Sequence, residues 1–118
     1  MFQVPPFQTM DLNEYQSQAL RTAIFPNRGN NFTYPALGLA GEAGEVADKL
    51  KKVIRDNGGE LTYPVAEAVG KELGDVMWYV AVLADELGFD LESIAINNLE
   101  KLASRSSRGV LTGSGDNR

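Results

Sequence analysis

The sequence contains no cysteine and no histidine among its 118 residues. The missing thiols exclude disulfides, thiolate nucleophiles and cysteine-ligated zinc or iron–sulfur sites. The missing imidazoles exclude Ser-His-Asp catalysis, histidine bases and ordinary zinc hydrolysis. An enzyme built from this chain must therefore work with Asp, Glu, Lys, Arg, Tyr, Ser, Thr and Asn. Carboxylates combined with hard metal ions are the commonest solution for such a set.

Positive charge and long apolar runs are also scarce. Lys and Arg number 11 against 16 Asp and Glu, a net charge of −5, so no global positive field favours a nucleic-acid polymer as partner. No apolar run approaches the roughly 18 residues of a membrane span, and the start "MFQVPPFQTM" lacks the features of a signal peptide. We therefore expect a single cytoplasmic domain with no membrane partner.

Helical periodicity dominates the chain, and no strand-like alternation stands out. We expect an irregular arm over residues 1–10, an all-α domain over 11–108 and an irregular tail over 109–118. Asp11 with Glu14 has the form of a helix N-cap and its reciprocal partner, and Asp90 is a second N-cap candidate. The predicted helices run over about 11–24, 35–55, 62–87 and 90–105.

The third predicted helix is apolar around most of its circumference. A helix of this kind is packed on several sides, and a four-helix protomer this small would rarely bury it alone. The sequence therefore predicts a helical homo-oligomer. The residues that form this apolar surface are Val69, Leu73, Val76, Met77, Trp78, Val80, Ala81, Leu83, Ala84 and Leu87.

Two pairs of acids interrupt apolar helix faces. Glu42 and Glu45 are three residues apart, as are Glu72 and Asp75, so each pair projects from one side of its helix. A lone E-x-x-E is usually two solvated surface glutamates. Here the apolar neighbours of both pairs favour four acids converging between packed helices, where only cations make their mutual repulsion tolerable. Oxygen-only ligation selects Mg²⁺, with Mn²⁺ as a possible substitute.

At this point the sequence resembles a known family. "GLAGEAGEVADKLKK" followed by "KELGDVMWYVAVLADELGFDLESIAINNLEKLASR" is similar to the MazG-type nucleotide pyrophosphohydrolases, whose pattern is E-x-x-E, a spacer, then E-x-x-D. The resemblance covers residues 11–108. It implies a four-to-five-helix bundle completed by homo-oligomerisation, as a dimer or a dimer of dimers. It also implies Mg²⁺-dependent hydrolysis of a nucleoside triphosphate to the monophosphate and pyrophosphate. The implied metal ligands are Glu42, Glu45, Glu72 and Asp75.

Candidate substrate residues lie mainly on the fourth helix. Asn98 falls in the middle of the apolar stripe of that helix, where we expect it to be buried; a bond to neighbouring backbone is the alternative role. Lys101 and Arg105 complete an N-x-x-K-L-x-x-R run that matches the family's nucleotide-contacting helix, and we assign them to phosphate oxygens. Lys49 is either a phosphate ligand or a helix salt-bridge partner of Glu45.

Two further side chains are candidates for contacts with the base or sugar. Tyr79 shares the face of Asp75, and Gln16 lies on the apolar side of the first helix. Trp78 points elsewhere, and its default role is in the core or a subunit contact. Among the acids, Glu45 is our candidate for accepting the proton of the attacking water.

Three other functions stay open at this stage. Phosphoribosyl-ATP pyrophosphatase and dimeric dUTPase share helical carboxylate machinery, although the "ELGDVMWYVAVLA" context favours the MazG type. A non-catalytic helical oligomer that binds nucleotide or metal is the third, and four intact acids argue against it. The sequence names neither the base nor the sugar, and it leaves pool cleaning and signalling equally open.

Overall fold

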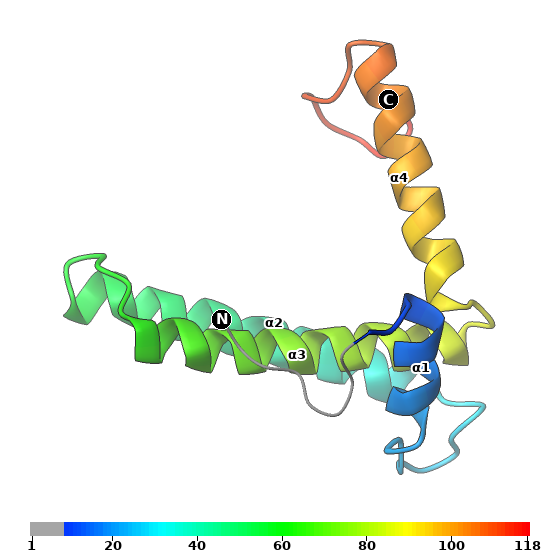
Figure 1. Cartoon of the computed structure of the whole chain (residues 1–118), viewed down its shortest axis with the longest axis horizontal. Coiled ribbons are helices and arrows are strands. Elements are labelled where there is room, and N and C mark those ends of the chain that lie inside the picture. The colour runs from blue at the N-terminus through cyan, green and yellow to red at the C-terminus, as the bar shows by residue number, and fades with distance from the viewer. Residues whose placement is uncertain (1–8) are drawn as a thin grey trace.

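The chain folds into four helices with no strand among residues 9–118, which are the residues that the computed structural model describes (Figure 1). The all-α prediction is therefore confirmed. Most of the predicted arm, residues 1–8, lies outside the described part. No helix within that part is long and apolar enough to cross a membrane. The helices are α1 (Leu12–Leu20), α2 (Thr33–Asp56), α3 (Tyr63–Glu86) and α4 (Leu91–Ser107).

Both predicted N-caps are present. An Asp11 carboxylate oxygen accepts a hydrogen bond from the Glu14 amide at 2.7 Å, and Asp90 accepts one from the Ser93 amide at 2.8 Å. The prediction that the first helix reaches Ile24 is wrong, because α1 ends at Leu20. The carbonyl of Ala19 would have accepted the next helical bond, but it accepts instead from the amide and the hydroxyl of Thr22, at 3.0 and 2.8 Å.

The long helices α2 and α3 lie side by side as an antiparallel pair (Figure 1). Gly38 of α2 allows their closest approach, since the ring of Tyr79 on α3 lies against its backbone. A Cβ built on Gly38 would be 2.1 Å from the Tyr79 Cε1 atom. The pairing of these helices sets the distance between the acids of α2 and those of α3.

Replacing Gly38 with alanine should therefore destabilise the hairpin. The added methyl group would force the Tyr79 ring or the helix to move, a strain that typically costs about 1–3 kcal/mol. Thermal or urea denaturation would measure the loss. Gly70→Ala is the control, because a Cβ there meets no atom within 4 Å and alanine favours a helix by up to about 1 kcal/mol. Equal stability of the two variants would contradict the close packing at Gly38.

The buried core lies where α1 and the segment after it cross α3. One cluster joins Ala19, Ala81 and Leu91, and a second joins Ala23, Phe25 and Val82. Trp78 packs against both clusters, and its indole Nε1 donates to the Thr22 hydroxyl at 2.8 Å. The default role of Trp78 as a core residue is confirmed.

Two amide side chains of α1 fix the turn between α3 and α4. Gln16 is buried; its Nε2 donates to the Ala81 and Phe89 carbonyls at 3.0 and 3.1 Å, and its Oε1 accepts from the Leu91 amide at 3.1 Å. Asn13 accepts from the Glu92 amide at 3.0 Å and donates to the Glu92 carboxylate at 2.8 Å. The expectation that Gln16 reaches a base is wrong, because both of its polar atoms are engaged in this turn.

Helix α4 projects away from the α2–α3 pair and does not contact α2 (Figure 1). The radius of gyration is 17.0 Å, whereas a compact domain of this length would have one of about 13–14 Å. Apolar side chains on the open faces of α3 and α4 are accordingly exposed, including Leu73, Met77 and Leu99. Within one chain, α3 is therefore not surrounded on all sides as its composition predicts.

Candidate functional site

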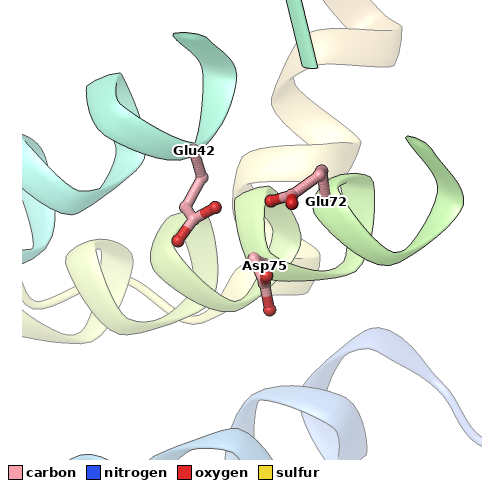
Figure 2. A group of neighbouring side chains, drawn as sticks. All are labelled: Glu42, Glu72 and Asp75. Carbon is pink, nitrogen blue, oxygen red and sulfur yellow. The ribbon is translucent and has the colours of Figure 1, made fainter. Parts of the chain in front are cut away.

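Three of the four predicted acids converge between α2 and α3. Glu42 comes from α2, and Glu72 and Asp75 come from one side of α3, as the three-residue spacing predicts (Figure 2). One carboxylate oxygen from each lies within 4.8 Å of the other two. Glu42 and Glu72 are half-buried, whereas Asp75 is exposed, so the cluster has an open side toward solvent.

The neighbouring acids of this cluster affect the ionisation of Glu42. The pKa of Glu42 is raised above its ordinary value, chiefly by a hydrogen bond with the Glu72 carboxyl, and further by burial and by the charge of Asp75. A raised carboxyl pKa is the response expected when like charges are brought together without a cation. The donor set is all oxygen, and it therefore fits a hard divalent cation.

Glu45 lies one turn beyond Glu42 on α2 and does not belong to the group of three. Its side chain is exposed, although its charge contributes to the raised pKa of Glu42. The structure thus places Glu45 beside the cluster but outside the group whose carboxylate oxygens lie within 4.8 Å of one another. Its assignment as metal ligand or proton acceptor stays a prediction.

Lys49 lies next to the acids, but its partner differs from the one considered in the sequence. Its Nζ atom is 3.7 Å from the Glu72 Oε1 atom, across the two helices, and both side chains are half-buried. The pair does not involve Glu45. Lys49 therefore brings a positive charge to the edge of the carboxylate group.

Two tyrosines flank the site. The pKa of Tyr79 is raised by burial and then by the nearby Tyr34, Glu42 and Asp75. That of Tyr15, on α1, is raised by burial and then by Asp75. Tyr15 was not among the candidates from the sequence, because it falls in an apolar stripe of α1 with Ala19. A tyrosine within such a stripe carries a hydroxyl group that needs a polar neighbour, and this was the signal available for placing it near the acids.

The candidates on α4 are not brought to the acids of their own chain. Asn98 and Lys101 are exposed, and α4 has no contact with α2. The expected burial of Asn98 is wrong for the single chain, because α4 leaves the bundle instead of packing along α3. Arg105 is buried, but under the tail, where its Nη2 atom donates to the Asp116 carbonyl.

Comparison with known proteins bears on this arrangement. Residues 32–110 match the MazG nucleotide pyrophosphohydrolase domain. The chain belongs to the MazG family. It is also 47% identical over 114 residues to the Gene 37 protein of Mycobacterium phage L5, an alignment that spans 92% of this chain and 100% of that protein. No solved structure matches the chain.

Membership of the MazG family confirms the resemblance drawn from the acid spacing and the "ELGD" context. The matched segment contains α2, α3 and α4 and therefore all four predicted acids. MazG proteins are nucleotide pyrophosphohydrolases that generally depend on divalent metal, and the acidic group of α2 and α3 is consistent with that chemistry. Helix α1, which supplies Tyr15 and fixes the α4 turn, lies outside the MazG match.

Proposed function

We propose that the protein hydrolyses a ribo- or deoxyribonucleoside triphosphate to the monophosphate and pyrophosphate, using Mg²⁺, with Mn²⁺ as a possible substitute. The convergence of Glu42, Glu72 and Asp75 supports this proposal most directly. In a chain without histidine or cysteine, it is the group best suited to activate water beside a phosphate. Nucleotide-pool cleaning is the cellular role that this reaction would serve.

The chain's own residues account for the steps of the reaction. A divalent cation held by Glu42, Glu72 and Asp75 would neutralise phosphate charge and lower the pKa of a bound water. Glu45, exposed beside the cluster, accepts the proton as water oxygen bonds to phosphorus and the bridging α–β P–O bond breaks. Lys49 stabilises the phosphate oxygens, and the pyrophosphate leaves with the bridging oxygen. Tyr79 lines the nucleoside side.

We further propose that the functional unit is a homodimer, or a dimer of dimers, in which α4 serves the partner's acids. Because α4 leaves its own α2–α3 pair, the exposed Asn98 and Lys101 can reach a carboxylate cluster only on another copy. Arg105, buried under the tail, would act there through the tail that it holds. An apolar groove of about 340 Å³ between α3 and α4 would receive that copy. Its lining residues are Leu12, Val76, Met77, Val80, Leu91, Ile94, Ala95 and Asn98.

A nucleotide panel tests the proposed activity. The protein is incubated with ribo- and deoxyribonucleoside triphosphates, with phosphoribosyl-ATP, and with dUTP, in Mg²⁺ or in EDTA, and pyrophosphate release is measured. Release in Mg²⁺ alone would support the proposal, and the ranking would name the substrate. A silent panel accompanied by tight nucleotide binding would instead indicate a binding protein.

Divalent cations should stabilise the fold more at pH 7 than at pH 5. Because the folded-state pKa of Glu42 is raised, its contribution to stability is present below the ordinary pKa and is lost as pH rises through the folded value. The metal-free protein should therefore lose stability over that rise, and a bound cation should restore it by replacing the proton of Glu42. Thermal melts with Mg²⁺, Mn²⁺ or EDTA at both pH values measure this. A pH-independent shift would contradict cation binding at Glu42.

A further inference from the structure

The tail, residues 109–118, folds back on the last turns of α4 (Figure 1). It has neither helix nor strand, and its sequence is "GVLTGSGDNR". Gly109, Gly113 and Gly115 have φ angles of 71°, 118° and 90°, a region that glycine enters without strain. The tail is thus a glycine-dependent loop whose shape is held by side chains.

Arginine side chains bind the carbonyl groups of this loop. The Arg118 guanidinium donates to the carbonyls of Val110, Leu111 and Gly115 at 3.1, 3.0 and 2.6 Å. Two arginines of α4 bind the rest of the loop, Arg105 through the Asp116 carbonyl and Arg108 through the Arg118 carbonyl. The loop therefore turns its carbonyl oxygens toward three cationic groups.

Most of the backbone N–H groups of the same loop, unlike the carbonyl groups that the arginines bind, have no hydrogen-bond partner in the described part of the chain. Within residues 9–118, no backbone N–H of residues 111–118 donates a hydrogen bond to a protein group. Residues 111–117 are exposed, so these N–H groups are open to solvent. With the carbonyls held by cations, the N–H groups are the polar main-chain atoms left to bind an anion, and backbone N–H groups bind phosphate in this way in other proteins.

The arginines around the loop have no acidic side chain as partner. Arg105 is only 5% exposed, and its Nε atom is buried without a hydrogen-bond partner. Within residues 9–118, Arg105, Arg108 and Arg118 form no ion pair with an Asp or Glu side chain. A buried guanidinium without an anion is costly. The only acidic side chain of the tail is that of Asp116.

We propose that the tail is a phosphate-binding loop in which the free amides of residues 111–117 bind a phosphate group above the three arginines. Arg118 is a positioning residue that keeps the carbonyls turned away from the anion. The phosphate belongs either to a nucleotide or to free pyrophosphate, an assignment that rests on the proposed function. Since α4 carries the loop away from the acids of its own chain, a nucleotide bound here would belong to the partner's site.

Amide NMR spectra of the full chain during titration test the proposal directly. Inorganic pyrophosphate should shift the amide resonances of residues 111–117 saturably, whereas a nucleoside without phosphate should not. A non-hydrolysable triphosphate analogue with Mg²⁺ forms the second arm. Tighter binding of the analogue identifies the nucleotide as the source, and equal binding identifies the product. Tail resonances that stay in place at millimolar concentrations of both ligands would overturn the proposal.

Variants separate anion binding from simple charge. Arg118→Ala should weaken pyrophosphate binding about tenfold or more, and Arg118→Lys should not rescue it, because an ammonium group cannot span three carbonyls as a planar guanidinium does. Asp116→Asn should tighten binding by removing a negative charge. The control is Arg55→Ala, an exposed arginine of α2 paired with Asp56. Wild-type affinity in Arg118→Ala would overturn the proposal.

The NMR titration measures binding and not turnover. Its result therefore does not depend on whether the protein hydrolyses nucleotides. Pyrophosphate bound at the tail of a protein that hydrolyses nothing would contradict the proposed function and leave the loop assignment intact. If the protein hydrolyses nucleotides but its tail amide resonances do not shift with either ligand, the proposed function would stand and the loop assignment would be overturned. Unchanged α2 and α3 resonances in Arg118→Ala would show that the variant is folded.

Discussion

Replacing Glu72 with glutamine is expected to reduce pyrophosphate release by about 100-fold or more. Glu72 lies beside both Glu42 and Lys49, and it lies with Asp75 on the same side of α3. The amide keeps the shape of the side chain but removes its charge. The measurement is the initial rate of pyrophosphate formation at saturating nucleotide and Mg²⁺.

Glu67→Gln is the matched control for this experiment. Glu67 is also a half-buried glutamate of α3, but it lies outside the carboxylate group, so its loss should leave the rate within a factor of about two. Because Glu72→Gln removes like-charge repulsion, the variant should also melt no lower than the parent protein in EDTA. Full activity of Glu72→Gln would exclude the carboxylate group as the catalytic centre.

Mixing two inactive variants is expected to restore about one quarter of the parent activity. Glu72→Gln lacks the acid of α3, and Lys101→Ala lacks the lysine of α4. If α4 serves the partner's acids, then a mixed dimer contains one site in which both residues are intact. Random exchange makes about half of the dimers mixed, each with one working site of two, which gives about a quarter of the original rate.

The same mixture distinguishes the alternative arrangement. If α4 bent back to its own α2–α3 pair, every chain in the mixture would carry one defect in its own site, and no activity would return. Lys51→Ala serves as the control for loss of a lysine, since Lys51 is exposed and paired only with Asp48. That variant alone should keep its rate. Absence of recovery after verified subunit exchange would exclude α4 as a donor to the partner's site.

Local sequence signals gave accurate helix positions. The caps Asp11 and Asp90 and the break between the second and third predicted helices each depend on a few neighbouring residues, and the structure contains them where they were predicted. The convergence of Glu42 with Glu72 and Asp75 was also predictable, because spacing on a helix fixes which side chains share a face. Family resemblance then supplied the chemistry that geometry alone left open.

Features that depend on contacts between distant segments were not predictable. The end of α1 depends on Thr22 capturing the carbonyl of Ala19, a local competition that periodicity does not reveal. The direction of α4 depends on Gln16 reaching residues more than sixty positions away. The apolar face of α4 suggested packing in its own chain, so Asn98 was expected to be buried. An amphipathic pattern does not tell which copy of the chain covers it.

The turn held by Asn13 and Gln16 has a consequence for regulation by solution conditions. Both are neutral amides, and most of the hydrogen bonds that hold this turn involve backbone groups. The turn between α3 and α4 should therefore keep its geometry over the ranges of pH and ionic strength in which the carboxylate group would gain or lose a cation. If the protein forms the proposed dimer, the arrangement of its subunits should therefore stay the same when the divalent cation is removed, even though the proposed activity would be lost.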